Sequence, residues 1–143
     1  MVSNLIDDEL VSDLTNKAVH DDIDVIWTDG LSPYTPPCAS IAKRRIIMNL
    51  RWFNQRELAF QLGHEMTHIY LGTPSDRILY YCSSSSQNSV EYAANSGALD
   101  LLIPYYVDGM EANQINSVEF MERYAVPSHL ESIVKSKLSN YFK

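Results

Sequence analysis

The chain has 143 residues and a formal net charge of −7, with 45% hydrophobic and 20% charged residues. These values are ordinary for a globular protein, and the length suits a single domain, residues 1–143, with a real hydrophobic core. The acidic balance argues against direct binding of nucleic acid, because phosphate recognition needs a basic surface. No stretch has the character of a signal peptide or a membrane span, so we expect a cytoplasmic protein without membrane contact.

The first third of the chain predicts one helix and three strands. Apolar residues recur at helical spacing over residues 4–19, which favours an amphipathic helix. Alternating apolar residues predict a strand at 23–27, and two further strands are expected at 38–42 and 45–49, around a turn at Lys43-Arg44. We therefore expect a small, mostly antiparallel sheet that precedes the central helices.

A longer helix is predicted at about residues 55–71. Asn54 and Glu57 have the spacing of a capping box at its start, and Gly72 is typical of a helix end. An apolar stripe at helical spacing consists of Leu58, Leu62, Met66 and Ile69. The polar residues beside this stripe must be hydrogen-bonded or bound to metal if the helix is buried.

This helix contains the sequence His64-Glu65-Met66-Thr67-His68, the short HExxH motif of zinc peptidases. Side chains four residues apart lie on the same helix face, so His64 and His68 can offer imidazole nitrogens to one zinc ion. Glu65 is the predicted catalytic base, placed to hold and deprotonate a water on the metal. The alternative is a pair of unrelated histidines on a solvated helix face.

A second central helix is predicted between an N-cap at Ser89 and Pro104, which should end it. Glu91 lies in its expected first turn, where the helix dipole favours a carboxylate, and is the predicted third metal ligand. Asn95, one turn later, is predicted to accept from the second ring nitrogen of a ligand histidine. A simple helix-start charge is the alternative for Glu91. The next candidate ligands are Asp100 and Cys82.

The remaining segments predict a polar loop over residues 73–88 and two more helices, with Asn116 and Ser128 as their capping residues. Two short helices in this arrangement could bind DNA, but basic side chains are few there. Tyrosine hydroxyls and one further histidine are candidates to stabilise the transition state. These candidates are Tyr80, Tyr81, Tyr105, Tyr106 and His129.

Together these residues resemble the ImmA/IrrE family of bacterial and phage metallopeptidases. In that family a histidine–glutamate helix is followed by a helix with the pattern Glu-x-x-Ala-Asn-x-Phe-Ala-x-x-Leu-Leu-x-Pro. The matching residues here are Glu91, Ala94, Asn95, Ala98, Leu101, Leu102 and Pro104. The chain departs from the pattern at Gly97, where Phe is usual, and at Ala93, where many members have an acidic residue. The segment 120–128 also resembles the family's C-terminal part.

The resemblance implies an α+β, zincin-like and gluzincin-like fold, in which a small sheet packs against the HExxH helix and the Glu-bearing helix, with a helical C-terminus. It implies one zinc ion per chain and an endopeptidase in a bacterial host. Family members relieve gene repression by acting on a helix-turn-helix repressor, so the expected role is an anti-repressor protease of a phage or mobile element. The alternative is a non-cleaving anti-repressor that sequesters the repressor and has a structural zinc. The intact Glu65 favours cleavage.

Overall fold

The computed structural model describes residues 8–73 and 84–142. Its regular elements are α1 (Asp8–His20), β1 (Asp24–Thr28), β2 (Cys38–Ser40), β3 (Arg45–Asn49), α2 (Leu58–Leu71), α3 (Ser84–Val107), α4 (Ser117–Arg123) and α5 (Glu131–Tyr141). Short 3-10 helices are formed by Gln55–Glu57, Ala112–Gln114 and Ser128–Leu130. Among the described residues the fold is therefore α+β, with five α-helices and one three-stranded sheet, as expected at this level.

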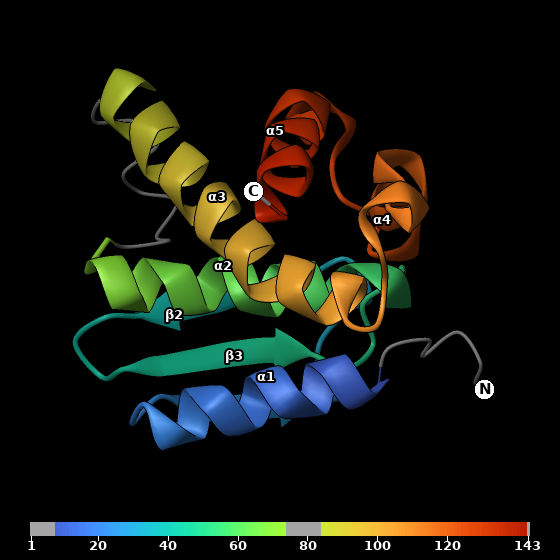
Figure 1. Ribbon diagram of the computed structural model, residues 1–143. Coiled ribbons are helices and arrows are strands. Elements are labelled where there is room, and N and C mark those ends of the chain that lie inside the picture. Colours follow the sequence, from blue (N-terminus) through green and yellow to red (C-terminus); the bar gives the residue numbers. More distant parts are fainter. Residues whose placement is uncertain (1–7, 74–83, 143) are drawn as a thin grey trace.

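Helix α2 is the centre of the molecule. It lies between α3 on one side and the sheet with α1 on the other, and α5 packs on α3 (Figure 1). Ten of its 14 residues are buried. They include the whole predicted stripe of Leu58, Leu62, Met66 and Ile69, which is thereby confirmed. Because most of the helix surface is buried, its polar side chains must find partners inside the protein.

The sheet is mixed, with the strand order β1-β3-β2. β3 pairs parallel with β1, where Val25 is opposite Ile46, and antiparallel with β2, where Ala39 is opposite Ile46. The expectation of a mostly antiparallel sheet is wrong, because alternation along a strand indicates which side chains face the core but not which strand becomes the neighbour. β3 is the central strand, and its Ile46 and Met48 are fully buried.

Helix α3 is longer than the sequence predicts. It begins at Ser84 rather than after Ser89, and it continues through Pro104 to Val107. The predicted first-turn position of Glu91 and the predicted stop at Pro104 are therefore both wrong. A proline inside a helix removes one hydrogen bond, but burial of the surrounding residues can outweigh that loss. The buried residues around it are Leu102, Ile103, Tyr106 and Val107.

The predicted helix caps are confirmed in part. Asn116 caps α4, since its Oδ1 accepts from the Glu119 N–H at 3.0 Å. The Asn54 Oδ1 accepts from the Arg56 N–H at 3.2 Å, which caps the 3-10 turn before α2 rather than α2 itself. Ser128 lies inside a 3-10 turn that leads into α5 and is not an N-cap. Local sequence patterns thus predict where a helix starts better than they predict which hydrogen bonds cap it.

Asn49, at the end of β3, holds the loop between β1 and β2. Its side chain is fully buried, and Nδ2 donates to the carbonyl oxygens of Ser32 at 2.8 Å and Thr35 at 3.0 Å. Its Oδ1 accepts from the Arg51 N–H at 2.9 Å. A buried amide with three partners fixes the backbone around it. The next residues of the loop, Pro36-Pro37, are held where they line a cavity beside α2.

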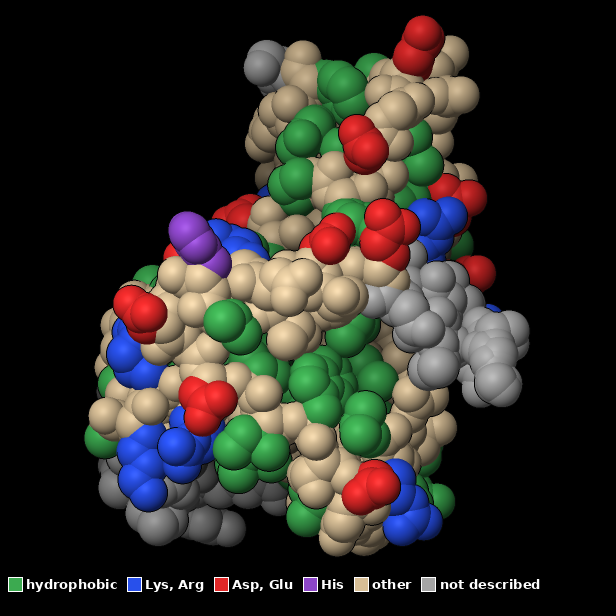
Figure 2. Space-filling view, turned by 90° about the horizontal axis from the view of Figure 1, so that it is seen from below, with side chains coloured by type: hydrophobic (Ala, Val, Ile, Leu, Met, Phe, Trp, Pro, Cys, Tyr) green, Lys and Arg blue, Asp and Glu red, His purple; other side chains and the backbone are tan. Residues whose placement is uncertain are grey.

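Figure 2 shows the α1 side of the molecule, where Lys and Arg side chains gather at one end and hydrophobic side chains occupy the middle. Two arginines, Arg44 at the end of the β2–β3 connection and Arg45 at the start of β3, make structural contacts. Arg44 donates to the backbone oxygens of Asp21 and Asp22, and Arg45 pairs with Asp24 at 3.1 Å. In the two ranges that the structure describes, no helix has both the length and the apolar character needed to cross a membrane.

Candidate metal centre

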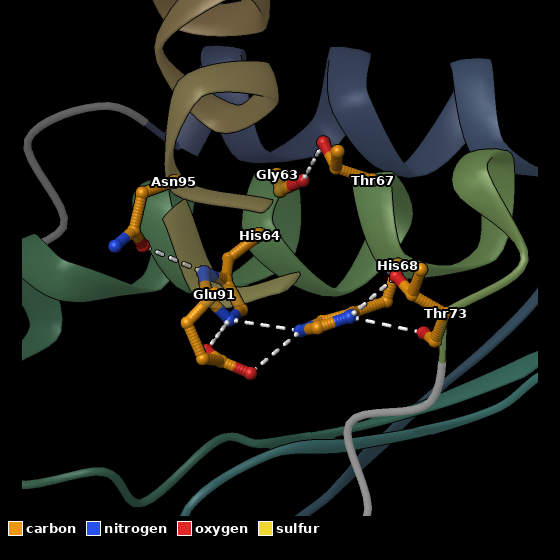
Figure 3. Close-up of polar contacts among 7 residues, drawn as sticks. All are labelled: Gly63, His64, Thr67, His68, Thr73, Glu91 and Asn95. Carbon is orange, nitrogen blue, oxygen red and sulfur yellow. Dashed lines mark hydrogen bonds and ion pairs between the residues drawn. The ribbon is translucent and has the colours of Figure 1, made fainter. Parts of the chain in front are cut away.

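His64 and His68 lie one turn apart on α2, and their Nε2 atoms are 3.1 Å apart. Glu91 on α3 faces both rings, with Oε2 3.0 Å from the Nε2 of His64 and Oε1 3.3 Å from the Nε2 of His68 (Figure 3). The candidate ligand atoms of this group all lie within 4.8 Å of one another. The structure therefore brings the three predicted ligands together from two helices.

Glu91 reaches the histidines because α3 packs very closely on α2. At their contact Gly97 faces Thr67, and a Cβ at position 97 would collide with the Thr67 side chain. A Cβ at Gly63 would lie 3.3 Å from the Ala98 Cα, which is also tight. Glycine permits this close approach of two backbones. The departure from the family pattern at Gly97 thus has a packing reason.

The C-terminal end of α2 supports His68. Gly72 is left-handed, with φ 70°, and its N–H donates to the Ile69 carbonyl, while the Thr73 N–H donates to the His68 carbonyl at 2.9 Å. This bonding pattern is a Schellman motif, which turns the chain back over the last helical turn. It brings Thr73 to the His68 ring, whose Nδ1 lies 3.0 Å from the Thr73 carbonyl oxygen and 3.1 Å from its Oγ1.

Thr73 is a site residue that sequence reasoning missed. The sequence contains a signal for it, because Gly72 at the end of a predicted helix favours a Schellman turn and the residue after that glycine returns toward the helix. The Gly72 turn ends the helix, which is the consequence that the sequence predicts. The turn also places a hydrogen-bond acceptor, Thr73, beside His68.

His64 is oriented from the other helix, since its Nδ1 lies 2.9 Å from the Asn95 Oδ1. Both Nδ1 atoms therefore face acceptors, so in the neutral form that binds metal each ring has its proton on Nδ1 and a lone pair on Nε2. For His68 the acceptor includes a backbone carbonyl, which cannot donate, so this tautomer is the one compatible with the contact. The second ring nitrogens are thus used to direct both Nε2 lone pairs at the same point.

The resulting donor set fits zinc. The two Nε2 atoms and the Glu91 carboxylate are separated by 3.0–3.3 Å. Tetrahedral zinc with bonds of about 2.0–2.2 Å needs ligand atoms about 3.3–3.6 Å apart, a small outward adjustment. When both rings are neutral, three acceptors at this distance repel one another unless a cation lies between them. Without metal, a proton on Nε2 relieves this repulsion by a hydrogen bond to Glu91. His64, His68 and Glu91 are therefore the residues that would hold a zinc ion.

Burial and neighbouring charges act in opposite directions on the pKa values of this group. Burial lowers the pKa of His64, but the hydrogen bond with Glu91 and the charges of Glu65 and Glu91 outweigh it, so the pKa is raised. Burial raises the pKa of Glu91, but hydrogen bonds with His64 and His68 bring that pKa down to about 2. Glu91 is therefore anionic at neutral pH, which is the form that binds metal.

A cavity of about 480 Å³ opens beside the candidate ligands. His64, Glu65, Glu91 and Asn95 all line it. Its other walls come from the start of α2, the segment before β2 and the turn after α4, and consist of Pro36, Pro37, Glu57, Phe60, Gln61, Ala125 and Pro127. Glu65 is only 5% exposed, so the predicted base lies in the cavity wall, shielded from bulk water.

The tyrosine candidates on α3 are not brought to this cavity. Tyr105 and Tyr106 follow Glu91 by 14 and 15 residues on the same helix. This spacing places them about 21 Å further along the helix axis. Tyr106 is buried and donates its hydroxyl to the Glu119 Oε1 at 2.7 Å. Tyr105 and Tyr106 lie far from the cavity because α3 continues through Pro104. If the helix had ended at Pro104, a turn in the chain could have brought these side chains back toward Glu91.

The other candidates also lie elsewhere or outside the description. His129 is exposed in the turn before α5 and is not among the residues that line the cavity. Asp100 is paired with Lys137 at 2.7 Å, more than two turns after Glu91. The remaining candidates, Tyr80, Tyr81 and Cys82, lie outside the residues that the structure describes.

Comparison of the chain with protein-family models, with curated proteins and with solved structures found no match. The function is therefore inferred from the residues and the geometry of the site itself.

Proposed function

We propose that this protein is a zinc-dependent endopeptidase with a zincin-like fold, as its resemblance to the ImmA/IrrE family implies. The observation that carries the proposal is the convergence of His64, His68 and Glu91 beside a cavity whose wall contains Glu65. Structural zinc sites usually have four protein ligands, whereas catalytic sites have three and an open position. Three candidate ligands, two of which line a cavity, support the catalytic alternative.

A zinc ion bound by these residues would polarise the scissile carbonyl and lower the pKa of a water molecule. Glu65 accepts a proton at its carboxylate and passes it to the leaving amine. Asn95 and Thr73 accept from the Nδ1 atoms of His64 and His68, which keeps both rings in their metal-binding orientation. A substrate bound in the cavity would lie against the same helix face, since His64 and Glu65 both line it.

The proposal extends to the substrate and the biological role. The substrate is a helix-turn-helix repressor in the bacterial cytoplasm, and its cleavage releases a phage or mobile-element switch. The family resemblance supports this role, and so does the net charge of −7, because a DNA-binding repressor has a basic surface. Sequestration of the repressor without cleavage is the alternative, with zinc as a structural element.

The deciding experiment is the substitution Glu65→Gln, which keeps the size of the side chain and removes the base. Because Glu65 is not a predicted ligand, zinc content measured by elemental analysis should not change. Cleavage should fall by about a hundred- to ten-thousand-fold, the usual contribution of a general base. The substrates are a mixed peptide library and any helix-turn-helix repressor that the neighbouring genes encode. The control is Glu131→Gln on the exposed face of α5.

The same experiment separates the two functions. Loss of cleavage and of derepression in Glu65→Gln, with repressor binding retained in a pull-down, supports the peptidase. Derepression that persists in Glu65→Gln without any cleavage would show that the protein acts by sequestration. Equal cleavage by wild type and Glu65→Gln contradicts the role of this residue.

A further inference from the structure

Glu57 adds a third carboxylate to the cavity, apart from Glu65 and Glu91. It ends the 3-10 turn that leads into α2, seven residues before His64. Seven residues correspond to two helical turns, so Glu57 lies about 10 Å from His64 along the axis and near the same face. The cavity lining thus includes residues of the candidate metal centre and, two helical turns away, a separate acid.

Two neighbours fix the position of this carboxylate. The Trp52 Nε1 donates to Oε1 at 2.9 Å, and the Asn54 Nδ2 donates to Oε2 at 3.2 Å. A carboxylate has about four acceptor positions, so each oxygen can still accept another hydrogen bond. A carboxylate that is already held in place loses little conformational entropy when a cation binds.

No basic side chain among the described residues forms an ion pair with Glu57. The described part of the cavity lining contains neither lysine nor arginine, and the ion pairs of the described chain involve other acids. Arg56, the preceding residue, is exposed and does not line the cavity. The two positive charges of a zinc ion would compensate the negative charges of Glu65 and Glu91. Glu57 lies too far from that ion for its own charge to be compensated in the same way.

We propose that Glu57 is a specificity residue that selects a lysine or arginine side chain of the polypeptide substrate. This inference rests on the proposed peptidase function. An extended chain advances about 3.3 Å per residue, so 10 Å corresponds to about three residues. The selected residue therefore lies within about three positions of the scissile bond. A basic side chain there exchanges water for a charge-assisted hydrogen bond to a positioned acid.

The test uses pairs of internally quenched peptides that differ only by lysine or glutamine at one position. The cleavage site is first located with a mixed peptide library, and the position is then varied over three residues on each side. The zinc-loaded proteins are the wild type, Glu57→Gln and the control Glu131→Gln. Glutamine keeps an oxygen that can accept from Trp52, so the substitution removes mainly the charge.

At one position the wild type should prefer lysine over glutamine in kcat/KM by about tenfold or more, as expected for a hydrogen bond to a charged group. The preference should fall below about twofold in Glu57→Gln, through slower cleavage of the lysine peptide, and should persist in the control. Absence of the preference in the wild type, or its persistence in Glu57→Gln, overturns the proposal. If thermal melting shows that Glu57→Gln is unfolded, Glu57→Ala, which also removes the charge, takes its place, and an unchanged preference there overturns the proposal.

A binding measurement separates failure of this proposal from failure of the peptidase function. Fluorescence anisotropy with the same peptides, labelled, compares zinc-loaded Glu65→Gln with Glu65→Gln/Glu57→Gln. If the wild type cleaves no peptide but lysine peptides bind more tightly and lose this advantage in the double variant, the subsite stands and the peptidase function does not. If neither peptide binds, or both bind equally, the subsite is overturned.

Discussion

The two histidines of the candidate metal centre are supported from different distances along the chain. The partner of His64 is Asn95, 31 residues away on another helix, whereas the partner of His68 is Thr73, five residues away in the turn that ends the same helix. The first support exists only when α2 and α3 are packed together. The second forms wherever α2 ends in its Schellman turn. The support of His64 therefore depends on the α2–α3 contact, and mutations can disrupt it more readily than the local support of His68.

The largest effect is expected from Glu91→Ala, which removes the candidate ligand on α3 itself. If a zinc site of about 10–16 kcal/mol is shared among four ligands, loss of one costs a quarter of that energy and weakens binding by about 70- to 900-fold. Zinc affinity measured by competition with a chelator tests this prediction. Affinity equal to that of the wild type would mean that the third ligand lies elsewhere.

Gly97→Ala should push α2 and α3 apart and so weaken the support of His64 more than that of His68. The new Cβ meets the Thr67 side chain, and such overpacking costs about 1–3 kcal/mol of the free energy of unfolding. Zinc affinity should fall as well, because Glu91 and Asn95 move together with α3. Urea denaturation and chelator competition measure the two effects.

The control for this change is Gly30→Ala, whose added Cβ would meet only ordinary contacts, at 3.5 Å from the Thr28 Oγ1. It should leave both stability and zinc affinity nearly unchanged. Adding Thr67→Ala to Gly97→Ala removes the two nearest atoms of the clash and should recover more than half of the lost stability. A double variant no more stable than Gly97→Ala would contradict the packing explanation.

Asn95→Ala and Thr73→Val compare the two supports directly. Asn95→Ala removes the side-chain acceptor of His64 and should weaken zinc binding by about ten- to a hundredfold. Thr73→Val removes only a hydroxyl, while the backbone carbonyl still accepts from His68, so the loss should stay below about tenfold. Chelator competition on both variants gives the ratio. An equal or larger loss in Thr73→Val would show that the hydroxyl, not the local backbone, supports His68.

The smallest effect is expected from Tyr70→Phe. The Tyr70 hydroxyl donates to the Asp21 Oδ2 at 2.6 Å and ties the end of α2 to the end of α1, 49 residues away. The pair is exposed, so its loss should cost less than about 1 kcal/mol in the free energy of unfolding. Zinc affinity should change by less than about twofold. A larger drop in affinity would show that the support of His68 is not local.

Local chemistry was sufficient to predict most of the helices. The apolar stripes of α1, α2 and α5, the capping of α4 by Asn116 and the end of α2 at Gly72 all depend on residues within a few positions of one another. The pairing of His64 with His68 belongs to the same class, because helical periodicity alone places them on one face. These features were predictable since they need no knowledge of the rest of the chain.

Features that depend on distant segments were not predictable in the same way. The parallel pairing of β1 with β3 and the continuation of α3 through Pro104 depend on which surfaces become buried together. The failed placement of Tyr105 and Tyr106 near the site follows from that continuation. Glu57 could be predicted as part of a helix start, but its place in the cavity wall depends on the loop that Asn49 holds.

The sequence by itself therefore determined the candidate groups: two histidines one turn apart, the predicted base Glu65 beside the first, and Glu91 with Asn95 one turn later. Only the tertiary structure decided that the two histidines and Glu91 converge within 4.8 Å of one another, beside a cavity that Glu65 and Asn95 also line. The physical reason is that helical periodicity orders side chains along one helix, whereas the distance between two helices is set by packing at a contact such as Gly97 against Thr67.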